Sequence, residues 1–184
     1  LENKKIGLVS NSSSIIRSGN KQVHLLDTLL KLNQKIKAVF APEHGFLSNQ
    51  ENGALIENVF DFKRNVNIYS LYGKNKKPSP NQLKDIDIML FDLQDVGARF
   101  YTYLSTLYFI IEACAENKIP LIILDRPNPN GHYIDGPLLE KKFLSFVGML
   151  EIPIVHAMTF GEIAKMINGE NLVNSKCEIK VIKM

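Results

Sequence analysis

Apolar residues gather in short runs along this chain, and most of these runs end abruptly at polar side chains. Short runs without polar alternation are typical of strands that are buried on both faces, as in a parallel sheet. The pattern therefore predicts strands with the following bounds: residues 6–11, 36–40, 67–73, 86–91, 119–124 and 178–182.

Between these runs, apolar residues recur at the three- and four-residue spacing of an amphipathic helix. This spacing predicts helices over residues 23–32 and from Tyr103 onward, and a single helical turn at 81–84. Thr159 and Glu162 form a capping box that predicts the start of another helix. Strands that alternate with helices predict an α/β fold, with a doubly wound, mostly parallel sheet and helices on both faces.

Two polar stretches interrupt this alternation. Residues 46–67 carry little periodicity and are long enough to form a functional flap over a site. The serines at 12–14 come directly after the first strand and precede a turn at 18–20. Because the glycines of a phosphate-binding loop are absent, we interpret this serine cluster as a polar loop.

The composition fits one globular domain and gives no sign of a nucleic-acid or membrane partner. The chain has 184 residues, of which 45% are hydrophobic, and its net charge of +3 comes from scattered side chains. A nucleic-acid partner is not expected, because no basic stripe is visible. No apolar run is long enough to span a membrane. The two cysteines lack metal-ligand spacing, so neither a zinc site nor another cofactor is predicted, and Cys114 is expected to be buried and inert.

Charged and polar side chains follow several predicted strands at the point where each strand ends. In open α/β sheets this edge is where ligands bind. Apolar surroundings favour the protonated form of a carboxyl group, and a nearby arginine favours the ionised form. Neighbouring carboxyl groups at such strand ends can therefore serve as an acid and a base. We predict catalytic roles for Glu43, Asp92 and Asp95, with Glu43 as the general acid. We predict substrate binding by Asn11, His44, Gln94, Arg99, Tyr101, Asp125, Arg126, Asn128 and His156.

Each of these side chains also has a structural interpretation. Asp92 is suited to accept hydrogen bonds from a loop, and Arg99 or Arg126 to brace the carboxylates, because ion pairs also create such clusters. His44 and His156 are suited to local hydrogen bonds, and Tyr101 to a core position with a tethered hydroxyl or to a sugar-stacking surface. At this level both interpretations stay open.

Five sequence blocks, taken together, resemble the signature of a bacterial family of exo-β-N-acetylmuramidases that act in peptidoglycan recycling and were formerly grouped as a domain of unknown function. The blocks are Phe40 to Phe46, Tyr69 to Gly73, Phe91 to Tyr103, Leu124 to Pro129 and Ser145 to Gly148. One departure is Ala157, where relatives have glycine between the corresponding histidine and methionine.

The resemblance implies a glycoside hydrolase that removes N-acetylmuramic acid from the non-reducing end of peptidoglycan fragments. It implies that residues 1–184 form the N-terminal Rossmann-like catalytic domain of a longer protein, with the active site in a cleft against a C-terminal domain that this chain lacks. It also assigns the acid to Glu43. For the second role we consider Asp92, Asp95 or the substrate's own acetamido group. For the lactyl carboxylate we consider Arg99 or Arg126, because a planar guanidinium group matches a carboxylate. Peptidoglycan turnover would suit the periplasm or the cell exterior.

Two alternatives remain at this stage. A metal-dependent hydrolase would use ligands from the set Glu43, His44, Asp92, Asp125 and His156, although no HExxH spacing supports it. The other alternative is a non-catalytic module that binds muropeptides.

Overall fold

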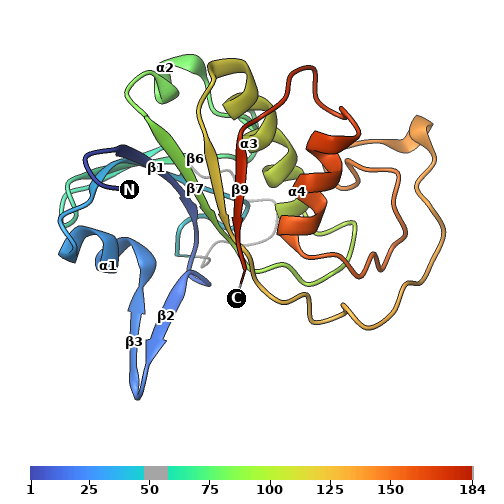
Figure 1. The fold of residues 1–184 in the computed structure, drawn as a ribbon, viewed down its shortest axis with the longest axis horizontal. Helices are drawn as coiled ribbons and strands as arrows, with labels where there is room; N and C mark the ends of the chain where they lie inside the picture. The colour runs from blue at the N-terminus through green and yellow to red at the C-terminus, as the bar shows by residue number, and fades with distance from the viewer. Residues whose placement is uncertain (48–57, 184) are drawn as a thin grey trace.

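One sheet of seven strands organises the computed structural model, which describes residues 1–47 and 58–183 (Figure 1). Its strands are β1 (Lys5–Ser10), β4 (Lys35–Ala41), β5 (Val59–Asp61), β6 (Val66–Ser70), β7 (Ile88–Asp92), β8 (Leu121–Leu124) and β9 (Ile179–Ile182). They lie in the order β5-β6-β4-β1-β7-β8-β9, and only the edge strand β5 runs antiparallel to its neighbour. Without β5, this is the third-second-first-fourth-fifth-sixth order of a Rossmann fold. The predicted doubly wound, mostly parallel sheet is confirmed.

Helices cover both faces of the sheet, as predicted. The helices are α1 (Leu25–Lys31), α2 (Pro80–Leu83), α3 (Tyr103–Asn117) and α4 (Phe160–Gly169), with a short 3-10 turn at Lys141–Phe143. Leucines of α1 pack with Ile6, Leu8 and Val39 in one core, whereas the apolar sides of α2, α3 and α4 share a larger core on the opposite face. Figure 1 shows α1 apart from the adjacent pair α3 and α4.

A hairpin replaces part of the predicted first helix. Strands β2 (Ile15–Ser18) and β3 (Lys21–His24) pair antiparallel, and the hairpin extends away from the sheet (Figure 1). Val23, which we predicted to be helical, pairs with Ile16 across this hairpin. The helix begins after His24, whose Nδ1 accepts a hydrogen bond from the Leu26 amide at 3.1 Å and so caps α1.

Other local predictions are confirmed or fall partly outside the described residues. Thr159 and Glu162 form the predicted capping box at the start of α4. The predicted flap at 46–67 lies in part at residues 48–57, which the structure does not describe, and the part that follows contains strand β5. Within residues 1–47 and 58–183, none of the helices has the length and apolar character needed to cross a bilayer.

The strand order itself positions a site. The chain leaves β1 toward β4 on one side and leaves β7 toward β8 on the other, so the loops that follow β1 and β7 diverge. Crevices at such switch points, outside the carboxyl ends of the strands, are where ligands bind in open α/β sheets. The hairpin separates β1 from α1, so no helix starts directly after the serine loop as it does in a dinucleotide-binding turn.

Candidate active site

A cleft of about 420 Å³ opens at the switch point between β1 and β7. Four of the predicted binding residues, Asn11, His44, Gln94 and Tyr101, line it. The other described lining residues are Ser12, Ser13, Val96 and Tyr103. The cleft is therefore built from the ends of β1, β4 and β7 and from the start of α3.

Glu43 lies beside this cleft, next in sequence to its lining residue His44. The Thr102 hydroxyl donates to its Oε2 at 2.6 Å, although Thr102 is the N-cap of α3, where a threonine oxygen usually accepts from the helix. The Tyr72 hydroxyl also hydrogen-bonds the Glu43 side chain. This bond, and then burial and the charge of Glu43, raise the pKa of Tyr72 above its ordinary value. Two hydroxyl groups thus fix the orientation of the Glu43 carboxyl group.

The backbone around Glu43 is equally constrained. His44 and Gly45 adopt φ values of 69° and 76°, so the chain reverses directly after β4. The Tyr103 hydroxyl donates to the Glu43 carbonyl oxygen at 3.4 Å and accepts from Asn11 Nδ2 at 2.8 Å. These bonds connect the ends of β1 and β4 to α3, and they explain why Tyr103 is buried while still contributing to the cleft.

The serine loop, which we interpreted as a polar loop, also lines the cleft. Ser12 and Ser13 line the cleft, and Asn11 Oδ1 accepts from the Ser13 amide at 3.0 Å and from its hydroxyl at 2.7 Å. The backbone N–H of Gln94 donates to Ser13 Oγ at 3.3 Å. The only signal in the sequence was a serine cluster directly after a strand, which is equally common in ordinary turns.

Asp92 and Arg126 form a bidentate ion pair next to the site. Arg126 Nε and Nη2 donate to the two carboxylate oxygens at 2.7 and 3.1 Å, and Asp92 is 2% exposed. Of the two arginines that we expected to brace the carboxylates, Arg126 does so at Asp92 and Arg99 does not. Arg99 Nη1 instead donates to the carbonyl oxygens of Pro137 and Ile152. Neither guanidinium group belongs to the described lining of the cleft.

Asp125 and Asn128 also have local partners. The Asp125 carboxylate accepts from the Thr159 hydroxyl at 2.8 Å and from the Gly161 amide at 2.9 Å, so it stabilises the N-terminus of α4. Asn128 Nδ2 donates to the Met158 carbonyl oxygen at 2.9 Å. Both residues are thus held by the segment that leads into α4, and neither belongs to the described lining of the cleft.

Asp95 and His156 face each other in the interior. Asp95 Oδ2 lies 3.4 Å from His156 Nε2, and the two residues are 3% and 2% exposed. His156 Nδ1 accepts from the Met158 amide at 3.3 Å, which places the ring hydrogen on Nε2, toward Asp95. No hydrogen bond is aligned between them, and within the described chain neither Asp95 oxygen has a hydrogen-bond donor. The contact therefore brings the loop after β7 against the loop before α4.

Ala157, the residue after His156, is the position at which the sequence departs from the family pattern. Ala157 adopts a φ of 60°, a left-handed conformation that glycine accepts without strain and alanine does not. The position at which the resemblance implies a glycine thus has a left-handed backbone here, with a methyl side chain.

The side chains named for the metal-dependent alternative lie apart in the described structure. Among residues 1–47 and 58–183, no three His, Cys, Asp or Glu side chains gather as potential ligands. Asp92 and Asp125, two of the five candidates, are instead bound to Arg126 and to the start of α4.

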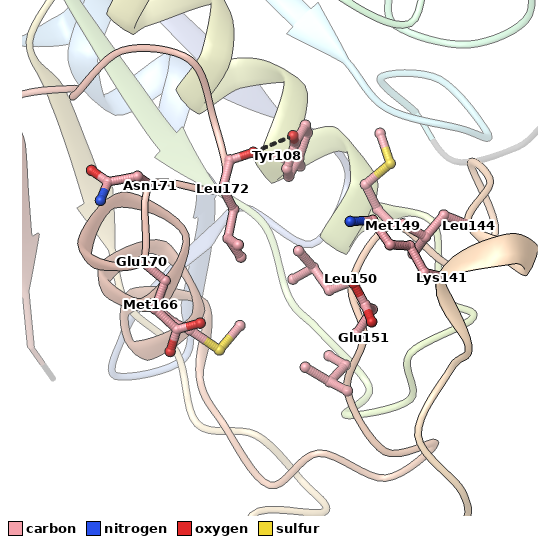
Figure 2. Close-up of a pocket in the computed structure, with 11 residues that line it drawn as sticks. Tyr108, Lys141, Leu144, Met149, Leu150, Glu151, Met166, Glu170, Asn171 and Leu172 are labelled. Carbon is pink, nitrogen blue, oxygen red and sulfur yellow. Dashed lines mark hydrogen bonds between the residues drawn. The ribbon is translucent and has the colours of Figure 1, made fainter.

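A second cavity of about 430 Å³ lies away from the strand ends, between α3, α4 and the segment around Met149 (Figure 2). The Tyr108 hydroxyl donates to the Leu172 carbonyl oxygen at its wall. None of the predicted catalytic or binding residues lines it, and its described lining mixes Met and Leu side chains with charged ones such as Lys141 and Glu151. The candidate active site is therefore the cleft at the switch point.

An α/β fold of Rossmann strand order, with a glutamate beside a polar cleft at the switch point, defines a class of small-molecule enzymes and binding proteins. Residues 6–184 match the family described as exo-beta-N-acetylmuramidase NamZ, N-terminal, and the chain belongs to this family.

Individual relatives agree with this family membership. The chain is 44% identical, over its whole length, to the peptidoglycan beta-N-acetylmuramidase NamZ of Bacillus subtilis, and covers 44% of that protein. Two crystal structures of DUF1343 family proteins from Bacteroides fragilis have TM-scores of 0.88 and 0.84, with 38% and 47% identity. They match 98% and 99% of this chain, which covers 45% and 47% of theirs. The chain thus spans about half the length of the relatives it matches.

Proposed function

We propose that this chain provides the Glu43 side of the active site of an exo-β-N-acetylmuramidase, a glycoside hydrolase that releases N-acetylmuramic acid from the non-reducing end of peptidoglycan fragments. The observation that carries the proposal is the Glu43 carboxyl group, held beside the switch-point cleft by Thr102 and Tyr72. The name of the Bacillus subtilis relative, a peptidoglycan beta-N-acetylmuramidase, supports the substrate class.

In the proposed mechanism, Glu43 protonates the oxygen of the leaving group while the bond to the anomeric carbon breaks. Glycosidases usually supply a second carboxylate as base or nucleophile. Neither predicted candidate lines the cleft, because Asp92 is paired with Arg126 and Asp95 faces His156. We therefore assign the second role to the acetamido group of the substrate, an arrangement that other amino-sugar hydrolases use.

Replacing Glu43 by Gln in the full-length protein that contains this chain tests the acid. The amide keeps the shape of the side chain but has no proton to give at the leaving oxygen, so release of free N-acetylmuramic acid from a muramyl glycoside should fall roughly 10²- to 10⁴-fold. Glu112→Gln is the matched control, because Glu112 pairs with Lys77 away from the cleft. Unchanged turnover in Glu43→Gln would remove the assignment.

The same experiment addresses the non-catalytic alternative. A muropeptide-binding module would bind the glycoside and release no sugar, in the wild type as in the variant. We further propose a periplasmic or extracellular location, since that is where peptidoglycan fragments arise. Cell fractionation with an antibody against the full-length protein checks it, and a signal confined to the cytoplasm would contradict it.

A further inference from the structure

Two of the sequence blocks, residues 69–73 and 145–148, meet at a group of side chains that the cleft does not include. The Tyr72 ring, whose hydroxyl reaches Glu43, lies with its centroid 6.0 Å from that of Phe146. Lys76 Nζ lies 4.7 Å from the centroid of the Phe146 ring. A series of groups thus leads from the proposed acid over two aromatic rings to an ammonium group, and we name Tyr72, Phe146 and Lys76 the aromatic shelf.

The aromatic shelf is held in place by the fold. Ser145 and Gly148 exchange two backbone hydrogen bonds, of 2.9 and 3.0 Å, and so close a tight turn around Phe146. The Ser105 hydroxyl of α3 donates to the Phe146 carbonyl oxygen at 2.6 Å. The Phe109 ring stacks on the Phe146 ring, with 6.3 Å between the two ring centroids. Phe146 and Tyr72 are both only partly buried. The Phe146 ring is thus held in a fixed orientation, and it keeps part of its surface exposed.

Lys76 differs from Lys77, Arg99 and Arg126 in the group that it contacts. Its neighbour Lys77 is bound to Glu112 and Glu116, at 2.8 Å each. Arg99 and Arg126, which we had predicted to bind a carboxylate, are occupied by carbonyl oxygens and by Asp92. For Lys76, by contrast, no carboxylate partner occurs among residues 1–47 and 58–183, and its contact is the Phe146 ring.

We propose that the aromatic shelf binds the muramic acid ring itself, and that Lys76 recognises its lactyl carboxylate. This inference rests on the proposed function. The apolar face of a pyranose ring packs on aromatic side chains, and its glycosidic bond would then lie toward Glu43 with the lactyl arm toward Lys76. A lysine ammonium on a flexible stem suits a carboxylate on a flexible ether arm. Because that carboxylate is what distinguishes muramic acid from glucosamine, Lys76 becomes the specificity-determining residue.

The test compares Lys76→Met with wild type in the full-length protein, on two substrates. These are 4-nitrophenyl N-acetyl-β-muramide and the methyl ester of its lactyl group, which has no charge. A hydrogen bond to a charged group is worth about 1.5–3 kcal/mol, so kcat/KM on the charged substrate should fall roughly 10- to 100-fold. On the ester it should change less than about twofold. Lys74→Met, at an exposed neighbouring lysine, should leave both values unchanged.

The aromatic part of the shelf has its own variant. Phe146→Leu should lower kcat/KM for both substrates by a similar factor, about 2- to 10-fold. Phe146→Tyr, which keeps the aromatic ring, should restore both values. If Lys76→Met lowers kcat/KM equally for the two substrates, or lowers it for neither, the inference is overturned.

Failure of the inference and failure of the proposed function give different results. A wild type that hydrolyses neither substrate removes the proposed function. In that case calorimetric titration with N-acetylmuramic acid and with its methyl ester still tests the shelf. Tighter binding of the acid that Lys76→Met abolishes would support it, and equal binding of acid and ester would overturn it.

Discussion

Gly97 lies where the loop after β7 passes closest to the loop after β8. Its φ is 76°, and a Cβ atom at this position would lie 2.1 Å from Asn128 Oδ1. Gly97→Ala should therefore lower the free energy of unfolding by roughly 2–4 kcal/mol, because the left-handed backbone costs alanine about 1–2 kcal/mol and the overlap adds to it. Urea denaturation measures the change.

Gly19 offers a matched control for this prediction. Its φ of 57° imposes the same backbone strain, but nothing lies within 4 Å of a Cβ atom there. Gly19→Ala should lose only about 1–2 kcal/mol. Equal losses in the two variants would show that Asn128 simply moves aside and that Gly97 has no packing role.

Arg126 should be essential for stability, because its partner is buried. The Asp92 side chain is 3% exposed, and removing Arg126 leaves its charge without compensation. Arg126→Met should lower the free energy of unfolding by about 3–5 kcal/mol. In the exposed pair between Lys5 and Asp85, Lys5→Met should lower it by less than about 1 kcal/mol. If Arg126→Met and Lys5→Met lower the free energy of unfolding by similarly small amounts, water reaches Asp92 and the prediction is wrong.

These residues also mark the limit of what the sequence can predict about the site. Glu43 and Gln94 were predictable, because each follows a buried strand and the ends of parallel strands meet at one edge. The partner of Asp92 was not predictable. Arg126 follows β8, and only the strand order of the folded sheet places β8 beside β7. Ser13 was missed because its role depends on a contact with Gln94, 81 positions away.

At the scale of elements, Arg64 connects helix α1 to the turn after β5. Its guanidinium group donates to Asp27 at 2.6 Å and to Asp61 at 2.9 Å. The hydrogen bond from Arg64 is the main reason that the pKa of Asp27 is lowered. Burial raises the pKa of Asp61, but its hydrogen bonds with Arg64 outweigh that effect and the pKa is lowered.

This arrangement predicts a pH dependence of stability. Both carboxyl groups have a folded-state pKa below the ordinary value of 3.8, so their contribution is present above that pH. It is lost as the pH falls through the lowered folded-state values. Wild type should therefore be more stable than Arg64→Met at pH 7, and the difference should shrink below about pH 4. Denaturant titrations of both proteins at the two pH values measure it, and a difference that grows on acidification would contradict the sign.

The elements themselves were predictable where the periodicity was long or the capping signal clear. Helix α3 shows its apolar face over 15 residues, and the Thr159 capping box fixes the start of α4. The hairpin β2–β3 was missed because the leucine spacing that identifies α1 extends back to Val23. A cross-strand partner such as Ile16 leaves no comparable trace in the sequence.

For the molecule as a whole, the two cores lie on opposite faces of one sheet and share its strands. Leu107 of α3 is fully buried in the larger core, and Leu29 of α1 is 6% exposed in the smaller one. Alternate residues of the same strands enter the two cores: in β4, Phe40 points to the larger core and Val39 to the smaller. Loss of either core therefore removes the packing of strands that the other core needs.

Leu107→Ala and Leu29→Ala should consequently shift the same single unfolding transition. Each should lower the free energy of unfolding by about 2–5 kcal/mol, since a buried leucine leaves a cavity. Leu32→Ala, at an exposed leucine just after α1, should change it by less than about 0.5 kcal/mol. Circular dichroism and tyrosine fluorescence should give coincident midpoints in urea for every variant, with an unchanged denaturant slope. If Leu29→Ala instead produces a second, earlier transition, the α1 face unfolds on its own. The ends of β1 and β4 that carry Asn11 and Glu43 would then belong to the less stable part of the protein.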